Sequence, residues 1–153
     1  MRMIQPSNAG EWEQVRELFR EYWGSFGFSP CFQDFGAEVA GLPGAYAPPG
    51  GALVLALLDG QAAGCAALRR FDASRAEAKR LYVRPQFRGQ GVGRALLEWV
   101  IAGAREMGYR ELVGDTIPQM AVALAMYDHA GFERSGPYAE TPTPGAIYLR
   151  LKL

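Results

Sequence analysis

A chain of 153 residues with 49% hydrophobic and 12% aromatic residues can form one well-packed core but hardly two, so we expect a single domain over residues 1–153. Sixteen Lys and Arg residues balance sixteen Asp and Glu residues, which excludes a general attraction to nucleic acid and leaves phosphate binding to locally placed charge. Two widely spaced cysteines and the lack of a long apolar run favour a cytoplasmic protein without disulfides, an export signal or a membrane span.

The first half of the chain predicts a strand, two helices and a β-hairpin. Ser7 or Asn8 can cap the first helix, and the apolar residues that follow recur at helical spacing. Pro and Gly residues then break all regular structure at 43–51. Two apolar runs separated by Asp59-Gly60 are the strongest hairpin signal in the chain. The predicted elements are a strand at 1–5, a helix with apolar residues over 12–26, a short helix at 35–42, and hairpin strands at 52–58 and 62–68.

The second half predicts four strands and two helices. Gly108 is placed to end the first of these helices as a left-handed cap, and the second helix ends at Gly131. Strands interleaved with helices, together with the hairpin, predict an α/β or α+β fold with a mixed sheet and helices on both faces. The predicted elements are strands at 76–83, 110–115, 132–135 and 146–151, and helices that begin near residue 91 and over 119–130.

A glycine-rich segment joins the strand at 76–83 to the helix that follows it. Gly89, Gly91 and Gly93 lack Cβ atoms, so the backbone can adopt unusual dihedral angles and a ligand can approach the N–H groups closely. These N–H groups and the positive end of the helix dipole form a site for a pyrophosphate, to which Arg88 and Arg94 can add hydrogen bonds. A tight strand-to-helix turn is the alternative, and it explains one or two of the glycines rather than three.

Other ligand motifs fit the sequence less well. The dinucleotide fingerprint G-x-G-x-x-G, started at Gly89, needs glycine where Arg94 stands, and the Walker sequence Gly-Lys-Ser/Thr does not occur. His129 is the only histidine, so we expect a surface residue there and no metal site. Cys65 lies in an apolar run, where a core residue is expected.

Three segments resemble the GCN5-related N-acetyltransferase (GNAT) family. Their similarity to the family covers about residues 52–132. The resemblance implies acetyl-CoA as the cosubstrate, no metal, and a mostly antiparallel sheet whose order of elements agrees with the one predicted above. The three segments are the strand 77–83 (E-A-K-R-L-Y-V), the signature Arg88-x-x-Gly91-x-Gly93, and Tyr127 followed by Gly131-Phe132.

The resemblance also implies which residues bind the cofactor. In this family two central strands separate, and the pantetheine arm pairs with the backbone of the first strand. Many members carry an asparagine seven residues before the tyrosine, where this chain has Met120. The implied cofactor-binding residues are Leu81, Tyr82, Val83, Arg88, Gly89, Gln90, Gly91, Val92, Gly93 and Arg94.

Two residues are candidates for the catalytic chemistry. An acceptor amine with a pKa near ~10.4 must lose a proton before it attacks, and the departing thiolate must gain one. Glu77 matches a carboxylate that serves as the base in family members, although a solvated glutamate is the alternative. Tyr127 matches the tyrosine that protonates the thiolate, and a packed helix residue is the alternative. Strand alternation places Glu77, Lys79 and Leu81 on one face unless a bulge intervenes.

These residues predict an N-acetyltransferase that acts on a primary amine of a small molecule or peptide, with no nucleic acid or membrane as partner. The family position of the acceptor corresponds to segments 25–34 and 136–145, which carry several aromatic residues. A non-catalytic acyl-CoA-binding or sensor module is the alternative, and it would need neither Glu77 nor Tyr127. A scaffold that binds no ligand is a third possibility. The sequence leaves open whether the protein is a homodimer.

Overall fold

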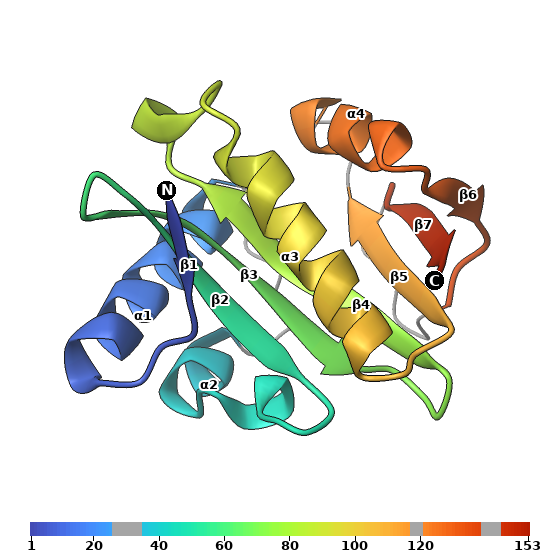
Figure 1. Ribbon diagram of the computed structural model, residues 1–153, viewed down its shortest axis with the longest axis horizontal. Coiled ribbons are helices and arrows are strands. Elements are labelled where there is room, and N and C mark those ends of the chain that lie inside the picture. Colours follow the sequence, from blue (N-terminus) through green and yellow to red (C-terminus); the bar gives the residue numbers. More distant parts are fainter. Residues whose placement is uncertain (26–34, 117–120, 139–144) are drawn as a thin grey trace.

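A seven-stranded sheet forms the centre of the molecule, with helices on both faces (Figure 1). The computed structural model describes residues 1–25, 35–116, 121–138 and 145–153. The strand order is β1-β2-β3-β4-β5-β7-β6, and all neighbours are antiparallel except β4 and β5. The elements are β1 (Arg2–Ile4), α1 (Ala9–Gly24), α2 (Phe35–Ala40), η1 (Gly44–Tyr46), β2 (Ala52–Leu58), β3 (Gln61–Arg70), β4 (Arg75–Val83), η2 (Pro85–Phe87), α3 (Val92–Glu106), β5 (Glu111–Thr116), α4 (Ala121–His129), β6 (Glu133–Ser135) and β7 (Ile147–Lys152).

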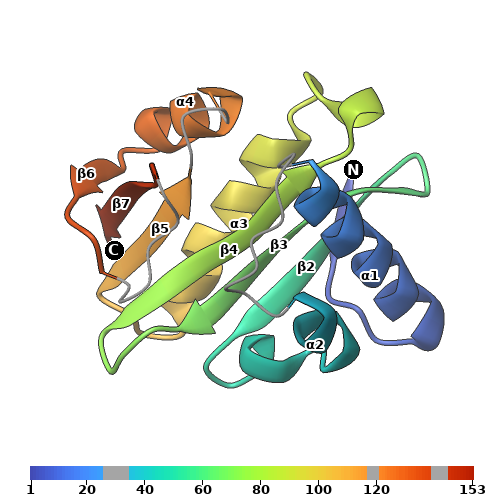
Figure 2. The same cartoon turned by 180° about the vertical axis from the view of Figure 1, so that it is seen from behind.

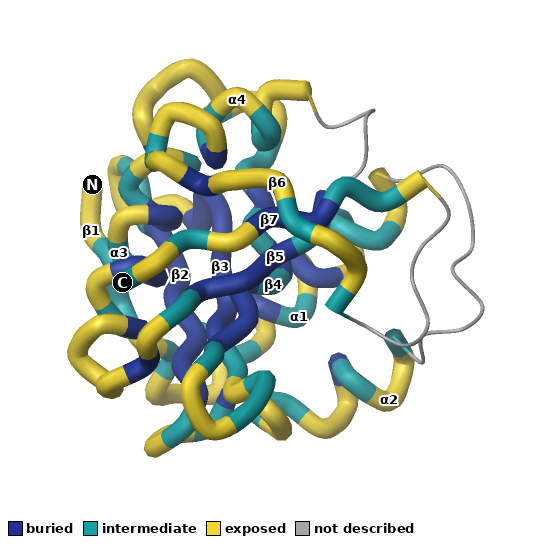
Figure 3. The backbone as a smooth tube through the Cα atoms, turned by 90° about the vertical axis from the view of Figure 1, so that its right-hand side faces the viewer, coloured by how far each residue is buried: buried dark blue, intermediate teal, exposed yellow. Residues whose placement is uncertain are grey.

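Two hydrophobic clusters lie on the two faces of this sheet. Helices α3 and α4 cover one face, where Leu96 and Leu68 belong to the larger cluster. Helices α1 and α2 cover the other face, where Phe19 and Leu55 are fully buried (Figure 2). Strands β2, β3 and β5 are therefore buried along most of their length (Figure 3). The predicted fold class, a mixed and mostly antiparallel sheet between helices, is confirmed.

Local signals in the sequence produced the expected local structure. The Asn8 side chain caps α1 by accepting a hydrogen bond from the Glu11 N–H at 2.9 Å. Asp59 and Gly60 both have positive φ angles, 51° and 76°, as a two-residue hairpin turn requires. The expectation of no regular structure at 43–51 was wrong, because η1 forms there. The Tyr46 N–H bonds the Pro43 carbonyl oxygen at 2.8 Å, a short helical turn that the fixed φ of proline permits.

A β-bulge interrupts β4 opposite β3. The pairing changes register between Cys65 opposite Tyr82 and Ala67 opposite Lys79, and Arg80 has a φ of 60°. Glu77 and Lys79 point to the α1 and α2 side, whereas Leu81 packs against the cluster under α3. The simple alternation that placed these three side chains on one face is therefore wrong, and the bulge is the reason.

Strands β4 and β5 separate after a short parallel stretch. Their pairing runs from Arg75 opposite Glu111 to Glu77 opposite Val113 and then stops, although β4 continues to Val83. The second half of β4 thus has a hydrogen-bonded neighbour only on the β3 side. In the described parts of the chain, no helix is long and apolar enough to cross a membrane.

Candidate active site

The glycine-rich loop before α3 has the backbone conformation that only glycine adopts easily. Gly89 and Gly91 have φ angles of 79° and 82°, and a Cβ atom at either position would meet nothing within 4 Å. Gly91 is the residue that caps α3. Because the first N–H groups of a helix have no partner inside it, those of Val92 and Gly93 are left for a ligand. The loop therefore combines required glycines with an open surface.

Gly93 has a different reason for being glycine. A Cβ atom there would lie 3.0 Å from Sδ of Met126 on α4 and 3.5 Å from a methyl carbon of Val83 on β4. The missing side chain lets α3 pack closely against α4 and the end of β4. Of the three glycines, Gly89 and Gly91 thus serve the loop conformation, and Gly93 serves helix packing.

The two arginines near the loop are exposed but differently placed. Arg88 folds back, so that its Nε donates a hydrogen bond to the Val83 carbonyl oxygen at 3.0 Å. Arg94 pairs with Glu98 one turn along α3, where its Nε lies 3.1 Å from Oε1. Arg88 is therefore fixed beside the end of β4 and the loop, whereas Arg94 is held on the outer surface of the helix.

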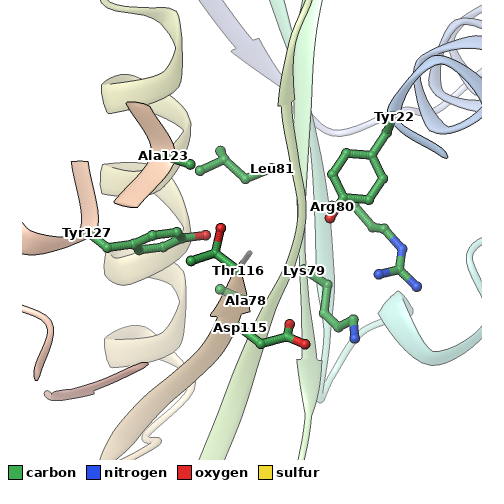
Figure 4. Close-up of a pocket in the computed structure, with 9 residues that line it drawn as sticks. All are labelled: Tyr22, Ala78, Lys79, Arg80, Leu81, Asp115, Thr116, Ala123 and Tyr127. Carbon is green, nitrogen blue, oxygen red and sulfur yellow. The ribbon is translucent and has the colours of Figure 1, made fainter. Parts of the chain in front are cut away.

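The separation of β4 from β5 leaves a pocket between them (Figure 4). Sequence reasoning had selected two of its lining residues, Leu81 and Tyr127, as site residues. It missed Asp115 and Thr116, although two polar residues at the end of an apolar strand were a usable signal. Most of segments 25–34 and 136–145, which were expected to border the acceptor, lies outside the described residues, as does Met120. The pocket is lined by Tyr22 of α1, Ala78, Lys79, Arg80 and Leu81 of β4, Asp115 and Thr116 of β5, and Ala123 and Tyr127 of α4.

Tyr127 reaches the pocket from α4. The residue is 5% exposed, and its ring packs edge-on against Phe132 with 5.1 Å between centroids. Its hydroxyl points into the pocket (Figure 4). Burial raises the pKa of Tyr127 above its ordinary value, and the nearby Tyr22 and Asp115 add to this. The phenol therefore stays protonated across the physiological pH range, as a proton donor must.

Glu77 lies outside the pocket lining and has partners at both carboxylate oxygens. Oε1 accepts a hydrogen bond from Nε of Arg69 at 2.7 Å, and Oε2 accepts one from the Tyr138 hydroxyl at 2.7 Å. Lys79 Nζ lies 3.6 Å from Oε2. Burial raises the pKa of Glu77, but Lys79, Arg69 and the Tyr138 hydrogen bond outweigh it and hold the pKa below its ordinary value. This glutamate is a weaker base than an ordinary one, and the structure does not bring it together with Tyr127.

Asp115 is the carboxylate that the pocket itself contains. It makes no hydrogen bond or ion pair with any part of the chain that the structure describes. Figure 4 shows its carboxylate turned toward the side of β4 that carries Lys79. Burial lowers the pKa of Lys79, and the charges of Glu77 and Asp115 partly offset that effect. Asp115 therefore supplies negative charge on the α1 and α2 side of the pocket.

Arg80 ties the wall formed by α1 and α2 to the bulge of β4. Its guanidinium makes two hydrogen bonds to the Glu38 carboxylate, at 2.8 and 2.7 Å, and lies 4.1 Å from the ring centroid of Trp23. A non-glycine residue with positive φ is strained, and the ion pair of the buried Arg80 with the partly buried Glu38 holds this conformation in place. The bulge and the helical wall therefore form one rigid unit.

Comparisons with known proteins agree with this geometry. Residues 12–132 match the Acetyltransferase (GNAT) family. The chain is 33% identical to an uncharacterised N-acetyltransferase of Schizosaccharomyces pombe, with 99% of each protein covered. A GNAT-family acetyltransferase structure from Staphylococcus aureus has a TM-score of 0.82 at 19% identity and covers 99% of this chain and 98% of its own. Another structure, from Elizabethkingia anophelis with acetyl-CoA bound, has a TM-score of 0.58 at 29% identity. It covers 67% of this chain and 76% of its own.

The Staphylococcus aureus structure has the same fold along nearly the whole of this chain. This chain belongs to the GNAT family of acetyltransferases.

Proposed function

We propose that this protein uses acetyl-CoA to acetylate a primary amine of a small molecule or peptide. The observation that carries the proposal is the glycine loop at the start of α3, which lies beside the open edge of β4 and a pocket that contains the Tyr127 hydroxyl. The acetyl-CoA bound to the similar enzyme of Elizabethkingia anophelis supports the choice of cosubstrate.

The chain offers hydrogen-bonding groups for two parts of the cofactor, the extended arm and the pyrophosphate. Acetyl-CoA supplies the acetyl group as an activated thioester. The unpaired edge of β4 can accept an extended arm as an added strand, and the N–H groups before α3 can hold a pyrophosphate. The residues that hold the cofactor in this proposal are Leu81, Tyr82, Val83, Arg88, Gly89, Gln90, Gly91, Val92, Gly93 and Arg94.

Proton transfer is divided between the two faces of the sheet. Tyr127, on the α4 side, donates its hydroxyl proton to the departing sulfur. On the other side Asp115 attracts the acceptor ammonium, because it is the pocket carboxylate without a partner among the described residues. The ammonium releases one proton to water, the neutral amine attacks the thioester carbonyl carbon, and the C–S bond breaks as the sulfur takes the Tyr127 proton. Glu77 stays a candidate base, yet its full set of partners favours a role in holding Lys79 and Tyr138 in place.

The experiment is a thermal-shift series with CoA thioesters, followed by an amine panel monitored through release of the free thiol. We expect acetyl-CoA at 100 times its dissociation constant to stabilise the fold by about 2.7 kcal/mol. Thiol release that depends on an amine supports the transferase. Binding without turnover of any amine would favour the sensor module instead, and no binding would contradict both. A cytoplasmic location stays a prediction.

A further inference from the structure

Thr116, the last residue of β5, carries a buried hydroxyl without a partner. The residue is 6% exposed, and its Oγ1 has no hydrogen-bond partner among the described residues. Leaving such a group unpaired costs free energy, so native proteins nearly always pair it. Because Thr116 also lines the pocket, a ligand bound there can supply the missing partner.

The position of Thr116 explains why the described residues provide no partner. Pairing of β5 with β4 ends at Val113, so no strand runs beside Thr116 on that side. On its other side β7 places Ile147 opposite, which has no polar side-chain atom. The Thr116 hydroxyl therefore lies at the point where β4 and β5 have separated.

Thr116 lies on the α4 face of the sheet. Side chains alternate along a strand, so Thr116 shares a face with Leu112, which belongs to the cluster under α3, while Asp115 points to the opposite face. Figure 4 shows the Thr116 and Tyr127 hydroxyls directed into the same part of the pocket. The remaining lining on this side is apolar and consists of Ala78, Leu81 and Ala123.

We propose that the Thr116 hydroxyl hydrogen-bonds the thioester end of acetyl-CoA. This inference rests on the function proposed above and adds to it a binding residue that the sequence did not reveal. Apart from the Tyr127 hydroxyl, the wall around Thr116 is apolar, which suits a ligand atom that is polar but uncharged, such as a carbonyl oxygen, because a charge would lose its hydration there. The acceptor ammonium is better served by Asp115 on the other face. Thr116 thus holds the thioester whose sulfur Tyr127 protonates.

Thr116→Val tests the inference, because valine keeps the shape and the strand preference and removes only the hydroxyl. Without ligand, we expect its Tm to rise by about 2–4 °C, since an unpaired buried polar group is lost. Its Kd for acetyl-CoA, measured by calorimetry, should rise about three- to tenfold, the loss of one neutral hydrogen bond. Thr116→Ser, which keeps the hydroxyl, should bind within about twofold of the wild type.

Tyr148→Phe is the matched control. The Tyr148 hydroxyl is also buried and unpaired among the described residues, but the residue does not line the pocket. We expect its removal to raise the Tm as well and to leave the Kd for acetyl-CoA unchanged. An unchanged Kd or a lower Tm in Thr116→Val would overturn the inference, and so would equal weakening by serine and valine. Wild-type protein that binds no acetyl-CoA would instead contradict the proposed function and the inference with it.

Discussion

The loop before α3 and the pocket between β4 and β5 are assembled in different ways. The loop is contiguous in sequence, and Gly89 and Gly91 give it a backbone whose N–H groups would bind the cofactor in the proposed function. The pocket draws side chains from α1, β4, β5 and α4, and its shape depends on where two strands stop pairing. The loop conformation thus depends on a few adjacent residues, whereas the pocket exists only after the whole sheet has formed.

This difference teaches what a substitution can reveal in each region. A change in the loop alters the backbone of a few residues and leaves the two cores intact, so its effect should fall on cofactor binding. A change in the pocket can act on chemistry, on acceptor binding or on the stability of the sheet. Four experiments separate these effects, from the largest expected change to the smallest.

Tyr127→Phe in the pocket should have the largest effect on turnover. Only the hydroxyl is removed, and the ring keeps its packing against Phe132. Positioned proton transfer typically contributes ~10²–10⁴-fold, so we expect kcat to fall by that order while the Kd for acetyl-CoA stays the same. Steady-state rates with the true acceptor give kcat, and calorimetry gives the Kd for acetyl-CoA. A decrease of less than about threefold would leave Tyr127 as a packing residue.

Glu77→Gln should mainly reduce stability, by about 2–3 kcal/mol, because it leaves Arg69 and Lys79 without their shared carboxylate. The folded pKa of Glu77 lies below its ordinary 4.5, so its contribution is complete above pH 4.5 and is lost as pH falls through the folded pKa. Chemical denaturation of the wild type and of Glu77→Gln between pH 7 and pH 3 measures the free energy of unfolding of each. We expect the difference between the two to shrink at acid pH.

Asp115→Asn is the matched control, because it makes the same change at a carboxylate with no ion pair in the described chain. Its stability should change by less than about 0.5 kcal/mol. Its acceptor KM should rise about tenfold, as expected when a charge is removed from an ammonium site. If Glu77→Gln instead lost its rate at neutral pH and recovered it at high pH with stability unchanged, Glu77 would be the base.

Gly91→Ala tests whether the loop acts through its backbone. Its φ of 82° is unfavourable for alanine, so we expect a loss of about 1 kcal/mol in stability and a weaker thermal shift with acetyl-CoA. Gly108→Ala, at the other end of α3, has a φ of 85° and equally open surroundings. The control should lose the same stability and keep its full thermal shift. Equal thermal shifts in both variants would remove the pyrophosphate assignment.

Arg88→Gln should have the smallest effect, about threefold in the Kd for acetyl-CoA, because the side chain is exposed and its contribution is screened by salt. Arg105→Gln makes the same charge change in the last turn of α3 and should leave the Kd unchanged. The difference between the two should decrease as salt is raised. If both variants weakened binding equally, net charge rather than a phosphate contact would be responsible.

Much of the fold could be predicted from the sequence, because its signals are local. A hairpin turn, a helix cap and a left-handed stop each depend on a few adjacent residues, such as Asp59-Gly60, Asn8 and Gly108. The same holds for the loop conformation at Gly89 and Gly91. The sequence by itself also determined the family, since its signature segments can be recognised without a structure.

Only the tertiary structure decided what Glu77, Asp115 and Thr116 face. The bulge at Arg80 changes the face of every later residue in β4, and it is stabilised by Glu38, 42 positions away in the chain. The pairing of β4 with β5 ends at Val113, and β7 places an apolar residue on the other side, so the Thr116 hydroxyl has no partner among the described residues. Such placements depend on contacts between distant segments, and the chemistry of each side chain follows from the neighbours that those contacts provide.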